Sequence, residues 1–239
     1  MTLQALIWDV DGTLAETERD GHLPAFNQAF AEAGLPWHWD EVTYSDLLKI
    51  TGGKERMAHW WRTQDAAGAT APDAPARLAA LHAAKTRLYT ERVAAGAVAL
   101  RPGVEPLIRG ARAQGLRLAI ATTTQPGNVQ ALLSHTLGAG VAGWFDVIGA
   151  GDVVPRKKPA PDIYRWVLQR LGLPAGETLA IEDSAVGVAA AAAAGVPVLA
   201  VRSFFTAHET ITGALAVLPA LPVSVADLIK LHASHADSA

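Results

Sequence analysis

Cysteine is absent from this chain of 239 residues. Without thiols, the protein can form no disulfide, no thiolate metal site, no iron–sulfur cluster and no thiol nucleophile. A chain without cysteine is typical of a reducing compartment, so we expect a cytoplasmic protein. The first residues agree, because they lack a basic start and their apolar run reaches Asp9 too soon for a signal peptide.

An excess of charge of one sign is also missing. The net charge is −3 and no Lys/Arg-rich run occurs, which argues against nucleic acids and anionic membranes as partners. The uncharged apolar stretch 185–201 is shorter than the roughly 20 residues that span a bilayer. With 50% apolar and 18% charged residues, the composition is that of a compact globular protein. We expect a monomer that acts on a small molecule.

Short apolar runs that end at polar residues recur along the chain, with helical segments such as 104–114 and 162–171 between them. Continuous apolar runs are typical of strands that are buried on both faces of a parallel sheet. The predicted strands are 3–10, 116–121, 145–149, 178–181 and 196–201. This alternation of strand and helix predicts a doubly wound, Rossmann-like α/β fold with a parallel sheet.

One interval interrupts the alternation. Over a hundred residues separate Asp11 from Thr122, whereas a βαβ unit needs about thirty. Apolar residues recur at helical spacing before Gly34 and again after residue 77. We therefore predict an inserted α-helical domain over residues 16–96 and an α/β core made of residues 1–15 and 97–239. The tryptophans of the insertion are expected in its core: Trp37, Trp39, Trp60 and Trp61.

The last residues, 232–239, are polar and small, and we expect them to form a frayed end. The two histidines in this tail are not interpreted as a metal site.

Polar side chains stand at the ends of the predicted strands or in the segments that follow them. In open α/β sheets, ligands bind beyond the carboxyl ends of the strands, so these side chains should meet in one place. They are Asp9, Asp11, Thr122, Lys158, Glu182 and Asp183. Carboxylates, a hydroxyl and a basic side chain together suit a divalent cation and a phosphate.

Asp9 and Asp11 are two residues apart at the end of the first strand. Strand alternation directs both carboxylates to the same side, and Gly12 permits a sharp turn. Asp9 suits a carboxylate nucleophile, which is ionised at neutral pH, and Asp11 suits the acid that protonates a leaving oxygen and later deprotonates water. An EF-hand loop is excluded by the glycine spacing, whereas an Asx turn stays an alternative for this motif alone.

The other strand ends have a chemical and a structural interpretation. Glu182 and Asp183 offer the hard oxygens that Mg²⁺ prefers, although adjacent acids are usually a surface pair. Lys158 can meet a dianionic phosphate, although a loop lysine is usually solvated. Thr122 can donate a hydrogen bond to phosphate, although β-branched residues also belong in strands for structural reasons.

Four segments resemble, in order and context, the motifs of the haloacid-dehalogenase-like superfamily: Asp9-Val10-Asp11-Gly12-Thr13, Thr122, Lys158-Pro159-Ala160-Pro161-Asp162 and Glu182-Asp183-Ser184. The resemblance covers nearly the whole chain, because that superfamily carries its cap domain between the first two motifs. It implies a phosphatase in which Asp9 is the phosphorylated nucleophile and Asp11 the general acid/base. It also implies a phosphate clamp of Thr122, Thr123 and Lys158, and Mg²⁺ held by Asp9, the Asp11 carbonyl and Asp183, with Glu182 close by.

Two segments of the insertion resemble the CbbY-type sugar-bisphosphate phosphatases: 18–27 and 49–57. The resemblance implies hydrolysis of xylulose 1,5-bisphosphate to xylulose 5-phosphate through an aspartyl phosphate.

The insertion offers a candidate site for a second phosphate. Gly52 and Gly53 at a helix start could present bare amides to an anion, while Lys54 and Arg56 add charge. A helix cap followed by a solvated face is the alternative. Glu16 and His22 could reach sugar hydroxyls, and a structural histidine is an equal account of His22.

We also consider several other functions for this set of residues. A sugar-phosphate mutase of the β-phosphoglucomutase type would share these motifs, as would a phosphatase for another ester such as phosphoglycolate. A phosphonate hydrolase would need a Schiff-base lysine, for which Lys49 and Lys54 are available. A haloacid dehalogenase has no use for the second acid, Asp11. A noncatalytic protein that binds Mg²⁺ or phosphate on the same fold is the alternative outside the enzymes.

Overall fold

The computed structural model describes residues 2–221 and 224–236, and within them six strands form one parallel sheet in the order β3-β2-β1-β4-β5-β6. The strands are β1 (Ala5–Trp8), β2 (Arg117–Ala121), β3 (Val147–Gly149), β4 (Thr178–Glu182), β5 (Val198–Val201) and β6 (Ala216–Leu218). The predicted doubly wound α/β fold is confirmed. β6 was not predicted, because it is a three-residue edge strand whose side chains are only partly buried.

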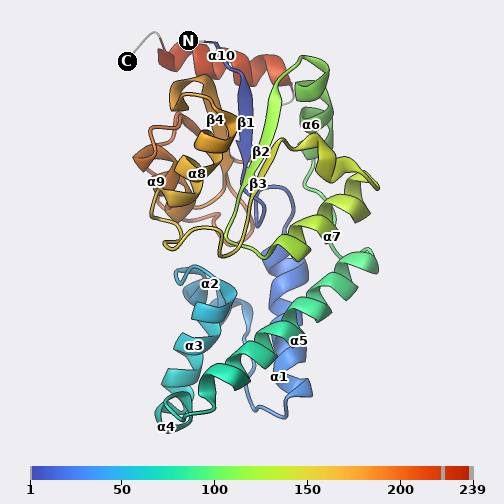
Figure 1. Cartoon of the computed structure of the whole chain (residues 1–239), viewed down its shortest axis with the longest axis vertical. Helices are drawn as coiled ribbons and strands as arrows, with labels where there is room; N and C mark the ends of the chain where they lie inside the picture. The colour runs from blue at the N-terminus through green and yellow to red at the C-terminus, as the bar shows by residue number, and fades with distance from the viewer. Residues whose placement is uncertain (1, 222–223, 237–239) are drawn as a thin grey trace.

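Helices cover both faces of the sheet (Figure 1). Leu6 and Trp8 of β1 belong to a core shared with helices α6, α7 and α10, whereas Ala5 and Ile7 belong to a second core shared with α8 and α9. This alternation follows from the two-residue period of a strand. The helices are α6 (Val104–Ala113), α7 (Pro126–Leu137), α8 (Asp162–Leu171), α9 (Ala185–Ala193) and α10 (Val225–Ala236), with short 3₁₀ turns at Val141–Trp144 and Ala175–Glu177.

A helical layer lies at one end of the sheet (Figure 1). It consists of a π-helical turn, Glu18–His22, followed by α1 (Leu23–Glu32), α2 (Glu41–Leu48), α3 (Gly53–Gln64), α4 (Ala66–Ala69) and α5 (Ala74–Ala94). The chain leaves the sheet and returns to it at neighbouring points, since Ala15 pairs with Leu100. α5 also packs against α7 of the core.

Aromatic rings form the centre of this layer. The Phe26 and Phe30 rings lie 4.7 and 4.8 Å from the Trp39 ring, respectively. Trp39 and Trp61 are buried, and Trp37 and Trp60 are partly buried. The tryptophans therefore contribute to packing, as predicted, rather than to an exposed stacking platform.

The prediction of a frayed end from residue 232 is wrong for residues 232–236, which continue α10. His232 is buried, and its Nε2 lies 2.9 Å from the carbonyl oxygen of Gly176. Val225 and Leu228 of the same helix are buried in the core, and this tertiary packing holds the helix in place. Residues 237–239 lie outside the described residues. No helix among the described residues combines the length and the apolar character that crossing a membrane requires.

Candidate active site

Three buried carboxylates meet at the carboxyl ends of β1 and β4. Asp9, Glu182 and Asp183 each place an oxygen within 4.8 Å of the others. The parallel register of β1 and β4 explains why these residues are close. Trp8 pairs with Ile181, so the residues that follow them, Asp9 and Glu182, lie side by side. We call these three residues the carboxylate cluster.

Lys158 reaches the cluster from the loop that precedes α8. Its Nζ donates to Asp9 Oδ1 at 2.7 Å, to Glu182 Oε1 at 2.6 Å and to the carbonyl oxygen of Ala121 at 2.8 Å. Tyr164 of α8 also donates to Glu182 Oε1. Burial acts to lower the pKa of Lys158, but Asp9 and Glu182 outweigh burial and raise the pKa. Lys158 is therefore a fixed cation within the cluster.

The carboxylate cluster fits a divalent cation. Burial raises the pKa of Asp9 well above its ordinary value, and the charges of Glu182 and Asp11 add to this effect while Lys158 opposes it. Burial likewise raises the pKa of Asp183, together with Asp9. Three ionised carboxylates with one buried lysine leave negative charge uncompensated, which is costly in a protein interior. An additional cation with oxygen ligands would relieve that cost.

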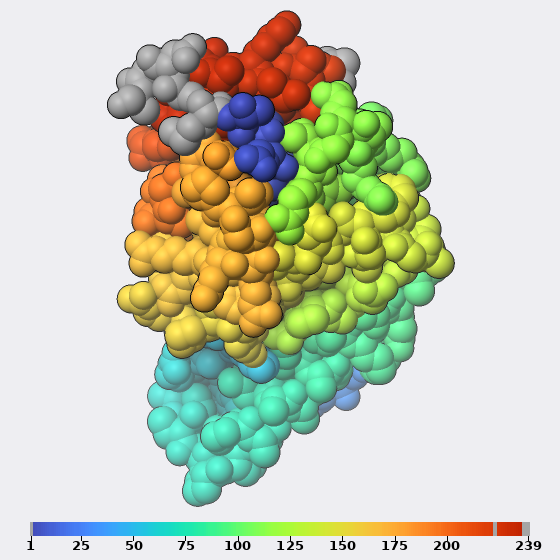
Figure 2. Space-filling model, turned by 45° about the horizontal axis from the view of Figure 1, so that its top comes forward, coloured from blue at the N-terminus to red at the C-terminus, as the bar shows by residue number. Residues whose placement is uncertain are grey.

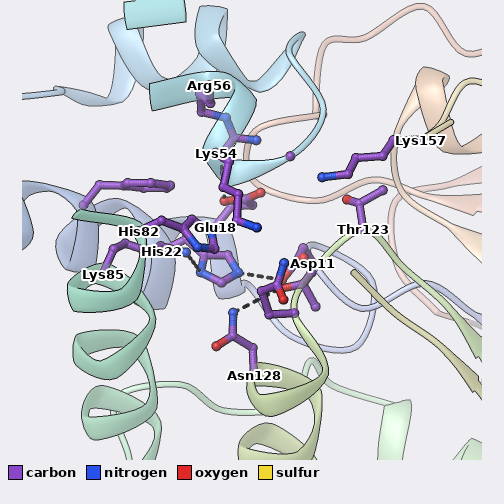
Figure 3. A pocket seen from close by; sticks show the side chains of 15 residues that line it. Asp11, Glu18, His22, Lys54, Arg56, His82, Lys85, Thr123, Asn128 and Lys157 are labelled. Atoms are coloured by element: carbon purple, nitrogen blue, oxygen red, sulfur yellow. Dashed lines mark hydrogen bonds and ion pairs between the residues drawn. The ribbon is translucent and has the colours of Figure 1, made fainter. Parts of the chain in front are cut away.

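The Asp11 carboxylate points toward His22 of the helical layer (Figure 3). Its Oδ1 accepts hydrogen bonds from Thr17 Oγ1 at 2.6 Å and from His22 Nε2 at 3.0 Å. The other ring nitrogen of His22 lies 2.7 Å from Lys85 Nζ on α5. Because an ammonium only donates, His22 accepts from Lys85 and donates to Asp11. Burial acts to raise the pKa of Asp11, but His22 and Thr17 outweigh burial and lower the pKa.

Lys85 is a site residue that the sequence analysis missed. It is buried, and burial lowers its pKa to about 8. Leu81, Leu88 and Tyr89 lie on the same buried face of α5. A lysine on an apolar helix face is the signal that could have drawn attention to it.

Arg56 is buried too, so the solvated face considered from the sequence does not describe it. Its Nε donates to the Leu47 carbonyl oxygen at 3.1 Å, and one terminal nitrogen donates to Tyr44 Oη at 2.8 Å. The same nitrogen lies 3.6 Å from Glu18, to which Tyr44 also donates. Tyr44 and Glu18 were not singled out from the sequence as partners of Arg56.

Lys54 lies in the first turn of α3 and is partly exposed. It follows the predicted helix start, where Gly52 precedes α3 with φ of +98°. Its ammonium lies 3.3 Å from Asp152 of the core. Lys157 of the core lies 2.8 Å from Glu55 of α3 and 3.1 Å from Asp152. These ion pairs join the N-terminus of α3 to the core loop. Figure 2 shows the helical layer in contact with the core.

The remaining predicted residues are placed as follows. Thr123 lines the cavities between the core and the helical layer, whereas Thr122 is buried and its Oγ1 accepts from the Thr124 N–H at 3.3 Å. Glu16 accepts from the Phe204 N–H at 3.1 Å and pairs with Arg101 at 3.4 Å. Its carboxylate therefore contacts the loop after β5.

Two adjoining cavities open between the sheet and the helical layer. One, of about 350 Å³, reaches from the carboxylate cluster to Lys49, Gly52 and Arg56. The other is lined from both sides by Lys54, Arg56, Lys85 and Lys157, together with the imidazoles of His22 and His82 and the carboxylates of Asp11 and Glu18 (Figure 3). Gly53 also lines it. The space suits a small molecule that carries negative charge at more than one position.

The haloacid dehalogenase-like hydrolase family model matches residues 3–195, and the chain belongs to this family. It is therefore an enzyme, a phosphatase-type hydrolase.

Within the family, the chain is similar to CbbY proteins over most of its length. It is 54% identical to the plasmid-borne CbbY of Cupriavidus necator, over 92% of this chain and 86% of that protein. It is 48% identical to CbbY of Rhodobacter capsulatus, over 96% and 98% of the two chains. Among solved structures, CbbY from Rhodobacter sphaeroides in complex with phosphate superposes with a TM-score of 0.88 at 44% identity, covering 95% of this chain and 99% of that one. A mutant of that protein, solved with xylulose-(1,5)bisphosphate, superposes with a TM-score of 0.87 at 43% identity, with the same coverage.

Proposed function

We propose that this enzyme is a Mg²⁺-dependent phosphatase that converts xylulose 1,5-bisphosphate to xylulose 5-phosphate through an aspartyl phosphate at Asp9. One observation carries the proposal: the Lys158-bound Asp9 carboxylate and the Asp11 carboxylate border one cavity that also reaches Arg56. The solved CbbY complex with xylulose-(1,5)bisphosphate supports the choice of substrate.

Asp9 attacks the phosphorus in the first step. Lys158 holds its Oδ1, which leaves Oδ2 as the attacking oxygen. A bond forms from Oδ2 to phosphorus and the ester P–O bond breaks. Asp11 must enter this step protonated, because the sugar oxygen takes its proton and leaves Asp11 ionised. The Thr122 hydroxyl, the neighbouring Thr123 and Lys158 bind the transferring phosphoryl oxygens as negative charge develops on them.

Water attacks the aspartyl phosphate in the second step. Asp11 accepts a proton from that water, the acyl phosphate P–O bond breaks, and Asp9 is restored. The hydrogen bonds from Thr17 and His22 favour the ionised form of Asp11, so the described arrangement suits this basic role. We assign His22, with Lys85 behind it, to orienting Asp11 rather than to a sugar hydroxyl.

The residues that would hold Mg²⁺ are Asp9, the Asp11 carbonyl oxygen and Asp183, with Glu182 close by. When bound, this cation neutralises charge on the phosphate and the carboxylates so that they can approach each other.

Residues 16–96 act in this proposal as the cap over a core of residues 1–15 and 97–239. The cap supplies the site for the second phosphate, with Lys54 and Arg56 as cations and the amides of Gly52 and Gly53 at the start of α3. Glu16 already accepts a hydrogen bond from the loop after β5. A contact between Glu16 and a sugar hydroxyl would be made in addition to this hydrogen bond.

A phosphate-release screen tests the proposal. The wild-type chain is assayed with and without Mg²⁺ on sugar mono- and bisphosphates, including xylulose and ribulose 1,5-bisphosphates and phosphoglycolate. We expect Mg²⁺-dependent release that is fastest from xylulose 1,5-bisphosphate. Isomerised sugar phosphate without free phosphate would indicate a mutase, and binding without any turnover would indicate a noncatalytic protein.

A further inference from the structure

The loop after β5 contacts the carboxylate cluster through Ser203. Ser203 Oγ donates to Asp183 Oδ2 at 2.6 Å, and both residues are buried. The Ser203 hydroxyl is itself held in place, because Thr206 Oγ1 lies 3.0 Å from it and also accepts from the Ser203 N–H at 2.9 Å. Ser203 therefore fixes one oxygen of Asp183.

Gly12 restricts the same oxygen from another side. This glycine has φ of +84°, and a Cβ placed on it would collide with Asp183 Oδ2 and lie 3.0 Å from Ser203 Oγ. The carboxylate is thus confined between Ser203 and the Gly12 backbone. Rotation of Asp183 would break the bond to Ser203, so Oδ1 is the oxygen left for a ligand.

The loop also contacts the helical layer. The Phe205 ring lies 5.5 Å from the Tyr44 ring of α2, and Tyr44 is the residue that accepts a hydrogen bond from Arg56. The backbone N–H of Phe204 donates to Glu16, where the chain enters the layer. One short loop therefore contacts both the carboxylate cluster and the neighbours of Arg56.

Arg202 stiffens this loop. A single guanidinium nitrogen donates to the carbonyl oxygens of Thr206, Ala207 and Glu209, at 3.0, 3.0 and 2.9 Å. The Glu209 carboxylate accepts from the Ala185 N–H at the start of α9, at 2.7 Å. Arg202 and Glu209 thus tie the loop after Phe205 to itself and to the start of α9.

We propose that Ser203 is a positioning residue for Asp183, and that its loop couples cation binding at the carboxylate cluster to the seating of the helical layer through Phe205 and Tyr44. This inference rests on the proposed metal-dependent function. Hydrogen bonds that orient metal ligands typically change metal affinity or activity by about 10 to 100-fold when removed.

The first test is a Mg²⁺ titration by calorimetry on the full chain without substrate. Ser203→Ala should weaken Mg²⁺ binding by about 10 to 100-fold, and Ser203→Thr, which keeps the hydroxyl, should bind within about threefold of wild type. In the phosphatase assay, Ser203→Ala should need correspondingly more Mg²⁺ while kcat at saturating Mg²⁺ is largely restored. Ser224→Ala, at an exposed serine before α10, is the matched control and should bind as wild type.

The outcomes separate this inference from the proposed function. If wild type binds no Mg²⁺ and needs none, the metal-dependent function fails. If wild type binds Mg²⁺ and Ser203→Ala binds it equally well, only the positioning role is rejected. Melting curves of both Ser203 variants show whether a loss of Mg²⁺ binding reflects unfolding. If Ser203→Ala does not fold, the Mg²⁺ affinity of a folded Ser203→Thr variant still tests the role of the hydroxyl.

The second test addresses coupling. Phe205→Ala should weaken Mg²⁺ binding by about fivefold, and combining it with Ser203→Ala should cost less than the product of the single effects. Phe204→Ala removes the adjacent, more exposed ring and should leave Mg²⁺ affinity unchanged. Additive effects of the two substitutions, or none from Phe205→Ala, would refute the coupling.

Discussion

The two walls of the cavity are built in different ways. On the core wall, Asp9, Glu182 and Asp183 stand at or directly after buried strands, and hydrogen bonds with Lys158 join two of them into one network. On the helical wall, Arg56 and Lys85 project from separate helices, and each is held by its own partners.

If the proposed function holds, the core wall carries out the chemistry and the helical wall selects the substrate. Backbone register fixes the core residues relative to one another, so a change there should affect every substrate alike. Residues of the helical wall such as Lys54 lie away from the carboxylate cluster, so a change there should affect only those substrates that reach them. Lys85 is the informative exception, because it reaches Asp11 through His22.

Asp9→Asn is expected to have the largest effect, since an amide cannot form an acyl phosphate. Phosphate release should fall by about 10⁴-fold or more on all substrates. The fold should be retained because Lys158 keeps Glu182 as its partner. Steady-state assays and thermal melting measure the two effects, with Asp227→Asn, at an exposed position of α10, as control. Turnover near that of wild type would remove Asp9 from the mechanism.

Thr122→Ala should lower kcat by about 10² to 10³ on every substrate. The Thr122 oxygen accepts from the Thr124 N–H, which leaves its hydroxyl proton free for a phosphoryl oxygen. The comparison variant is Thr123→Ala, because Thr123 is the next residue in the sequence and lines the cavity. A loss below threefold for Thr122→Ala would return this residue to a purely structural role.

Lys85→Met should lower kcat by about 10²-fold by releasing His22 and with it Asp11. Because burial lowers the pKa of Lys85 to about 8, wild-type kcat should decline above that pH as the ammonium donor is lost. The variant should lack this alkaline limb. An unchanged pH profile in Lys85→Met would contradict the role, and Lys230→Met, at an exposed position of α10, is the control.

The same pKa predicts a change in stability. An unfolded lysine keeps a pKa of 10.5, so between about pH 8 and 10.5 the unfolded chain binds more protons than the folded chain. The contribution of Lys85 to the free energy of unfolding therefore rises with pH across this window. Denaturant titrations at both ends should show that rise in wild type and a smaller one in Lys85→Met.

Lys54→Ala should have the smallest and most selective effect. We expect kcat/KM to fall by about 10 to 100-fold for the bisphosphate, through loss of a charge-assisted contact, and to change little for small monophosphates. Asp152→Asn frees Lys54 from its ion pair and should lower KM for the bisphosphate. Equal losses on both substrate classes would refute the distal-phosphate role.

Local pattern was enough to predict most of the sheet and the core wall. Apolar runs mark the buried strands, and the residue after each run falls at the carboxyl edge of the sheet, so Asp9 and Asp183 could be grouped before their contact was known. Pattern failed for β6 and for the end of α10, where length and polarity carry little information and packing decides.

The sequence by itself determined the α/β fold, the insertion and the residues at the strand ends, because strand and helix periods are local properties of the chain. Only the tertiary structure decided which partners meet: Lys85 with His22, Arg56 with Tyr44, and Ser203 with Asp183. Those pairs lie 63, 12 and 20 residues apart and come from different elements. Their contacts depend on how whole elements pack, which no local period encodes.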